Sequence, residues 1–231
     1  FSVRVVAKVK NSLTINELAR GPRLIGQFAR WATGRPNILA IVPSLIHIFA
    51  KSNETLDLPD LQGVFAPASF KAGYVGVLDD YPGMTCGFWP HRPESVGYVR
   101  AASTDPFTSP VIQPNYLAAK TDQQVIVAAI KICRRLAATD ALKPYVIDET
   151  FPGGACQNDE ELLDSAREIG QSIYHLMGTC RMGTRTDKNA VVDANLKVHG
   201  IGNLRVIDAS IMPTMVSANL NAAVMMIAEK G

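Results

Sequence analysis

Residues 63 to 102 alternate between short β-type runs and clusters of chain-breaking residues, and this pattern restricts the possible folds more than any other feature. The runs GVFAPASF, MTCGFWP and SVGYVRAA are separated by Pro, Gly and Asp residues. Such punctuated runs are typical of an antiparallel sheet with connecting loops. The opening run, FSVRVVAKV, predicts one more strand.

Three helices are indicated by apolar residues at three- and four-residue spacing. In the first, Pro22 suits the opening turn and the pattern ends near Gly34. The second begins with Thr121 or Asp122 as its N-cap. The apolar face of the first comprises Leu24, Ile25, Phe28 and Trp31. The second is expected to bury Val125, Ile126, Ala129, Ile132 and Leu136, and to expose Lys131, Arg134 and Arg135.

The third of these helices carries the clearest boundary signals. It begins at Asn158, where Glu161 three residues later completes a capping box, and it ends at Gly170. Its expected buried residues are Leu162, Ala166 and Ile169.

Upstream, segment 105–117 contains three prolines and is expected to be an extended connector.

The last 41 residues have a different texture. Val191 to Val198 and Leu204 to Ile207 are expected to be strands joined by the turn HGIGN. A final helix is expected from Asn219 or Asn221 through AAVMMIA. Because this helix is apolar on every side, we expect it to be buried all round.

Composition excludes several classes of protein. A net charge of +2 with 47% apolar residues indicates a globular chain, and the scattered lysines and arginines argue against a nucleic-acid surface. The longest apolar stretch, 38–50, is about half to two-thirds of a bilayer span, so no membrane helix is expected. Pro43 and His47 also interrupt it.

The four cysteines and four histidines lack metal-ligand spacing, so no metal site is expected. Reduced thiols in a reducing, cytoplasmic compartment are the simpler interpretation, with a buried disulfide as the alternative. Phe1 begins inside a β-type run without an initiator Met or signal segment, so we expect that preceding residues are missing.

Three blocks near the C-terminus, in this order and spacing, resemble the C-terminal signature of the glucose-methanol-choline (GMC) oxidoreductases. They are YHLMGTCRMG at 174–183, NLRVIDAS at 203–210 and SANLNAAVMMIAEK at 217–230. The segment RPESVGYVRAASTDPFTSPVIQPNYL at 92–117 also resembles the substrate domain of the choline-dehydrogenase-like branch. The resemblance covers nearly the whole chain.

This resemblance implies an α+β and α/β architecture in two parts. Residues 1–170 would form a substrate-binding domain with an antiparallel sheet backed by helices. Residues 171–231 would form the C-terminal part of a Rossmann-like FAD-binding domain. The N-terminal part of that domain, which carries the glycine-rich turn for the pyrophosphate, would precede Phe1. This chain would then be either a truncated protein or one piece of a polypeptide cut in two, and the N-terminal part would be its partner.

The function implied by the resemblance is FAD-dependent oxidation of a primary alcohol to an aldehyde, by hydride transfer to flavin N5. The hydroxyl proton must leave as the hydride departs, and a histidine suits this role because its pKa of about 6.5 lies near working pH. His175 occupies the position of the family's active-site base. From the local pattern alone, a histidine beside Leu176 and Met177 is more often a core residue bonded to backbone.

The resemblance places four further functions on the C-terminal residues. Asn219 would donate to the substrate oxygen and stabilise its developing charge, with a plain helix cap as the alternative. Asn221 would open the final helix toward the flavin, and Leu220 is grouped with it as cofactor-binding. Asp208, expected at a strand end, and Ala209 would lie against the ribityl and phosphate part of FAD, with a turn residue as the alternative for Asp208.

Some properties stay open at this point. Leu176 and Met177 stand where many relatives have Pro after the histidine, so the identity of the alcohol stays open. The electron acceptor is either oxygen or a quinone. The aromatic cage and the carboxylate that choline requires are not found by residue match. Phe88, Trp89 and His91 could line a pocket, although aromatic residues in a strand are more often in the core. The alternatives are a lyase that holds FAD without redox chemistry and an inactive isolated fragment.

Overall fold

The computed structural model of the chain describes residues 1–42, 44–71 and 76–231, which form two compact units. Pro43 lies outside these residues. The first unit comprises Phe1–Pro90 with Gln123–Gln171, and the second comprises His91–Asp122 with Ser172–Gly231. The assignment of 1–170 to a substrate-binding domain and of 171–231 to a cofactor-binding segment stays a prediction.

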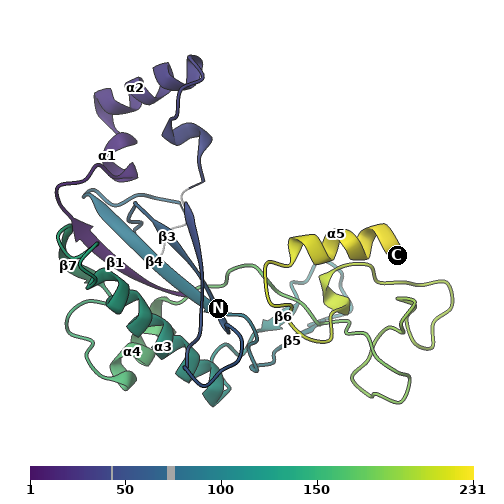
Figure 1. Cartoon of the computed structure of the whole chain (residues 1–231). Coiled ribbons are helices and arrows are strands. Elements are labelled where there is room, and N and C mark those ends of the chain that lie inside the picture. The colour runs from purple at the N-terminus through teal and green to yellow at the C-terminus, as the bar shows by residue number, and fades with distance from the viewer. Residues whose placement is uncertain (43, 72–75) are drawn as a thin grey trace. The chain divides into compact units, whose positions relative to one another are not determined.

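Within the described residues, the first unit contains a five-stranded antiparallel sheet in the order β2-β3-β4-β1-β7 (Figure 1). Its strands are β1 (Val3–Val9), β2 (Ile46–Ala50), β3 (Leu61–Ala66), β4 (Gly83–Pro90) and β7 (Val146–Phe151). The opening run and the runs GVFAPASF and MTCGFWP therefore contribute to the predicted sheet, whereas the run SVGYVRAA supplies a strand of a separate two-stranded sheet. The predicted α+β fold class is confirmed.

The helical elements that accompany this sheet are α1 (Ile15–Leu18), α2 (Gly21–Ala32), η1 (Ile38–Ala40), α3 (Lys120–Ala137) and α4 (Asp159–Ile169). Of these, α3 contacts the sheet directly. The thiol of Cys133 in α3 donates to the carbonyl of Cys86 in β4 at 3.3 Å, which holds the helix on the sheet. The core beneath them includes Leu61, Phe88, Ile126, Ile130 and Leu162.

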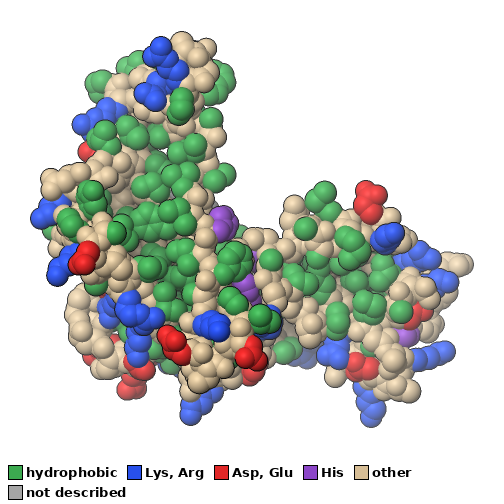
Figure 2. All heavy atoms as spheres, viewed as in Figure 1, with side chains coloured by type: hydrophobic (Ala, Val, Ile, Leu, Met, Phe, Trp, Pro, Cys, Tyr) green, Lys and Arg blue, Asp and Glu red, His purple; other side chains and the backbone are tan. Residues whose placement is uncertain are grey.

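The predicted helix boundaries are largely confirmed. Asn158 and Glu161 form the expected capping box of α4, and Gly170 is its C-cap. The helix α2 also forms as predicted, but its apolar residues Ile25, Phe28 and Trp31 are 71%, 53% and 60% exposed. Figure 2 shows hydrophobic side chains on the surface of this helix. The periodicity predicted the helix, while the described residues leave its apolar face uncovered.

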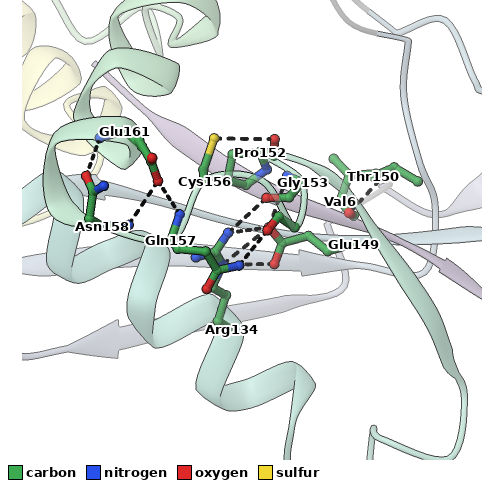
Figure 3. A network of polar contacts seen from close by, with 11 residues as sticks. Val6, Arg134, Glu149, Thr150, Pro152, Gly153, Cys156, Gln157, Asn158 and Glu161 are labelled. Carbon is green, nitrogen blue, oxygen red and sulfur yellow. Dashed lines mark hydrogen bonds and ion pairs between the residues drawn. The ribbon is translucent and has the colours of Figure 1, made fainter.

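The prediction that Arg134 is exposed to solvent is wrong. Its Nη2 and Nε donate to the carboxylate of Glu149 in β7 at 2.7 and 2.9 Å, and Nη2 also donates to the carbonyl of Gly153 at 3.2 Å (Figure 3). This pairing depends on α3 lying beside β7, which helical periodicity alone does not encode. The neighbouring Arg135 is exposed as predicted.

The second unit contains little regular structure and a small core. Its elements are β5 (Tyr98–Arg100), β6 (Val111–Gln113), η2 (Ala209–Ile211) and α5 (Asn221–Lys230). The short strand β6 lies inside the segment expected to be an extended connector and pairs with β5. The buried residues of the core are Val192, Ile211, Met212, Leu220 and Ile227.

The two strands predicted at Val191–Val198 and Leu204–Ile207 do not form. These segments form isolated bridges instead, which join Val192 with Val198 and with Met182, and Lys197 with Arg205. The carboxylate of Asp193 accepts hydrogen bonds from the backbone amides of Asn195 and Lys197 at 2.8 and 2.9 Å. Such local bonds turn the chain within the first segment and compete with a ladder.

The helix α5 forms as predicted, whereas its expected burial on every side, which requires a surrounding domain that this chain hardly provides, stays a prediction. Ile227 lies in the core of the second unit, whereas Met225 and Met226 are 61% and 55% exposed. The apolar surface of α5 is visible in Figure 2. Among the described residues the helix packs on one side, against η2 and its neighbouring loops.

Candidate active site

The segment after His175 runs beside η2, and this backbone pairing positions the histidine. The amides of Gly178, Cys180 and Met182 donate to the carbonyls of Ala209, Ser210 and Ile211 at 3.3, 2.9 and 2.7 Å. Gly178 has a φ of +85°, a left-handed conformation that favours glycine.

The residue before His175 has an unusual backbone. Tyr174 has a φ of +62°, and its amide donates to Ser172 Oγ at 3.1 Å. A bulky residue in the left-handed region costs about 1 kcal/mol and is concentrated at functional sites. Sequence reasoning missed this residue, because the conformation carries no local signal when the residue is not glycine.

His175 and Asn219 lie together. The amide Nδ2 of Asn219 is 3.4 Å from the ring Nε2 of His175. His175 is half-buried and Asn219 is exposed. If the amide nitrogen donates, Nε2 carries the lone pair and the ring proton lies on Nδ1. In that tautomer the basic nitrogen of the ring faces the amide.

The environment of His175 favours its neutral form. Partial burial lowers the pKa of His175 from its ordinary value of 6.5, because burial disfavours the charged ring. A neutral imidazole can accept a proton near neutral pH, so His175 is suited to act as a general base.

The sequence suggested that Asp208 ends a strand, and this prediction is wrong. Asp208 is the N-cap of η2, and its Oδ1 accepts a 2.8 Å hydrogen bond from the amide of Ser210. An aspartate favours this position because its carboxylate satisfies an amide at the helix start. Asp208 is exposed, and the half-buried Ala209 accepts the hydrogen bond from the amide of Gly178.

The N-terminus of α5 offers backbone amides to an anionic group. Leu220 is the N-cap, is buried and supplies no side-chain cap, and Asn221 is the first helical residue. Because the first amides of a helix lack intrahelical partners and carry partial positive charge, they suit negative charge on a ligand. The side chain of Asn219 contacts His175, so its placement does not depend on a role as helix cap.

The remaining candidates have structural positions. Phe88 is fully buried and His91 nearly so, while Trp89 is half-buried. The four cysteines, all within the described residues, are free thiols. The described part of the chain contains no cluster of potential metal ligands and no helix long and apolar enough to cross a bilayer.

A sequence model described as GMC oxidoreductase matches residues 93–228. Human mitochondrial choline dehydrogenase is 42% identical over 183 residues, which are 79% of this chain and 30% of the relative. The oxygen-dependent choline dehydrogenase of Proteus mirabilis is 40% identical over 186 residues, 79% of this chain and 32% of the relative. The matched region is thus about a third of the length of these curated relatives.

Solved structures show the same fold. Pyridoxine 4-oxidase from Mesorbium loti aligns with a TM-score of 0.72 at 28% identity, over 81% of this chain and 36% of that protein. Formate oxidase from Aspergillus oryzae aligns with a TM-score of 0.87 at 23% identity, over 99% of this chain and 44% of that protein. The second similarity, at its low identity, concerns the fold alone.

Proposed function

The chain belongs to the GMC oxidoreductase family, and on this premise we propose that the protein containing it oxidises a primary alcohol to an aldehyde with FAD as cofactor. The observation that carries the proposal is the 3.4 Å approach of the Asn219 amide to the imidazole of His175. Two chemically complementary groups, a base and a hydrogen-bond donor, thereby face one position on the protein surface.

In this proposal His175 is the general base. Its neutral Nε2 accepts the hydroxyl proton of the alcohol as the carbon–hydrogen bond breaks. The lowered pKa of His175, caused by partial burial, keeps the ring neutral and able to accept a proton at pH 7. The strained backbone at Tyr174 fixes the direction in which the chain enters His175.

Asn219 acts as the donor partner of the base. Its Nδ2 lies close enough to the imidazole to hydrogen-bond a substrate oxygen that approaches the same nitrogen. An amide cannot take up the proton, but it stabilises the negative charge that grows on the oxygen. When the alcohol binds, the amide N–H would transfer its hydrogen bond from Nε2 to the substrate oxygen, which leaves the lone pair of Nε2 free for the proton.

The described residues fit an FAD site. Uncapped amides at the start of α5 suit the negative charge of a reduced flavin, and Asn221 and Leu220 would line that end. Asp208, Ala209 and Asn219 would contribute the other contacts. FAD, when bound, supplies the acceptor for the hydride. We propose that polypeptide outside residues 1–231 completes this site, since the matched region is about a third of the curated relatives.

The proposed substrate is a small primary alcohol, since the relatives are named choline dehydrogenases and choline is a primary alcohol. An oxygen molecule or a quinone would take the electrons in the second half of the reaction.

Stopped-flow mixing of the full-length flavoprotein with alcohols under anaerobic conditions tests the proposal. We expect bleaching of the flavin absorbance, and a His175→Ala variant slower by at least about 100-fold, the scale of a general base. His47→Ala, at an exposed histidine of β2, is the matched control and should react at the parental rate. Flavin that no alcohol bleaches would favour a lyase, and an unchanged rate in His175→Ala would remove the base from the mechanism.

A further inference from the structure

Asn219 lies in an exposed, irregular stretch between η2 and α5, so its position depends on its neighbours. On one side, Leu220 is buried in the core of the second unit. On the other side, Oγ of Ser217 accepts a 2.6 Å hydrogen bond from Nη2 of Arg92. The catalytic amide is thus bracketed by a packed leucine and a hydrogen-bonded serine.

Arg92 reaches Ser217 from a fixed segment. The carboxylate of Asp122 accepts hydrogen bonds from the amides of Glu94 and Ser95, each at 2.9 Å. Asp122 is only 4% exposed, so these bonds are shielded from water. Oγ of Ser95 accepts a further bond from the amide of Ala119 at 3.0 Å. The backbone two and three residues beyond Arg92 is therefore held in place.

We propose that Arg92 is a positioning residue for Asn219, acting through Ser217, an inference that rests on the proposed function. The guanidinium anchors the backbone two residues before the amide, while Leu220 anchors the residue after it. Met215 and Val216 within the stretch also pack against the core of the second unit, whereas Ser217 is exposed and is held by its hydrogen bond with Arg92. Since a displacement of about 1 Å in a positioned group costs up to about 100-fold in rate, partial loosening should cost about tenfold.

A set of variants of the full-length flavoprotein tests this role. Arg92→Met and Ser217→Ala should each slow anaerobic flavin reduction about tenfold, and the double variant should be no slower than either. Arg92→Lys, which can still donate to Ser217, should recover part of the rate. Arg100→Met is the control, because Arg100 lies over the Tyr98 ring instead of contacting Ser217.

The decisive comparison is made in an Asn219→Ala background. There, Arg92→Met should cause no further loss of rate, because the group that Arg92 positions is gone. An equal tenfold loss in this background would overturn the proposal and show that Arg92 acts elsewhere. A normal rate in Arg92→Met would overturn it as well.

A second readout does not depend on catalysis. In protein labelled with ¹⁵N-asparagine, the side-chain amide signal of Asn219, assigned by its loss in Asn219→Ala, should shift or broaden in Arg92→Met and Ser217→Ala but not in Arg100→Met. An unchanged signal would overturn the positioning role. If Asn219→Ala itself reacts at the parental rate while the signal shifts as expected, the proposed function fails and the positioning of the amide stands.

Discussion

The side-chain amide of Asn219 lies 3.4 Å from the imidazole Nε2 of His175, although 44 positions separate the two residues along the chain. Backbone bonds from the 178–182 segment to η2 hold one partner, and the burial of Leu220 holds the other. The pair therefore depends on the small core of the second unit as much as on its own hydrogen bond.

The donor role of Asn219 predicts losses of different size for two substitutions. Asn219→Asp keeps the shape but places an acceptor, and at neutral pH a negative charge, beside the developing charge of the substrate. We expect Asn219→Ala to slow flavin reduction about 100-fold, as for loss of one oxyanion donor, and Asn219→Asp to slow it further. The measurement is anaerobic stopped-flow absorbance. An aspartate variant faster than the alanine variant would contradict the donor role.

The environment of His175 predicts the pH dependence of the reaction. Partial burial lowers the pKa of His175 below 6.5, and only the neutral ring accepts a proton. The rate of flavin reduction should thus be constant above the folded pKa and fall as pH drops through it, with the inflection below 6.5. The same profile in His175→Ala should lack this inflection. An inflection that persists in the variant would assign the titration to another group.

Sequence patterns predicted α2, α3, α4, β1, β3 and β4 of the first unit because the information is local, but not β2 or β7. Capping at Asn158, the period of α3 and the β-type composition of β1 each reside within a few residues. The position of Arg134 was mispredicted because its partner, Glu149, is set by the packing of α3 beside β7. Helical periodicity separates apolar from polar residues but does not identify which polar residue meets a partner.

In the second unit the predictions were weaker for a related reason. The strands expected at 191–198 and 204–207 have β-type composition, but Asp193 bonds its own backbone and turns the chain. The resemblance of three blocks supplied His175 and Asn219, and their proximity follows only from the fold. Arg92 and Ser217 were missed because their hydrogen bond joins residues 125 positions apart.

Burial predicts different reactivities for the free thiols. Cys133 is buried against the sheet, and burial raises the pKa of its thiol well above the ordinary value. Because the thiolate is the reactive form, a native protein treated with Ellman's reagent should release colour from Cys133 only upon unfolding. Cys180, which is half-buried, should react faster, as Cys180→Ser would show by loss of the early signal. Rapid native labelling of Cys133, located by mass spectrometry, would contradict this.

The pairing of Arg134 with Glu149 predicts a stability difference between two adjacent arginines. Both side chains of the pair are less than a quarter exposed, and the guanidinium donates three bonds to the carboxylate and one to Gly153. Arg134→Met leaves the half-buried Glu149 without its partner and should cost about 1–3 kcal/mol of unfolding free energy. Arg135→Met, at an exposed position of the same helix, should change the unfolding free energy by less than about 0.5 kcal/mol.

Urea denaturation of the two variants, followed by far-ultraviolet circular dichroism, compares them directly. Adding Glu149→Leu to Arg134→Met should restore part of the loss, because it removes the unpaired charge. Equal midpoints for Arg134→Met and Arg135→Met would show that the ion pair contributes no more than an exposed one.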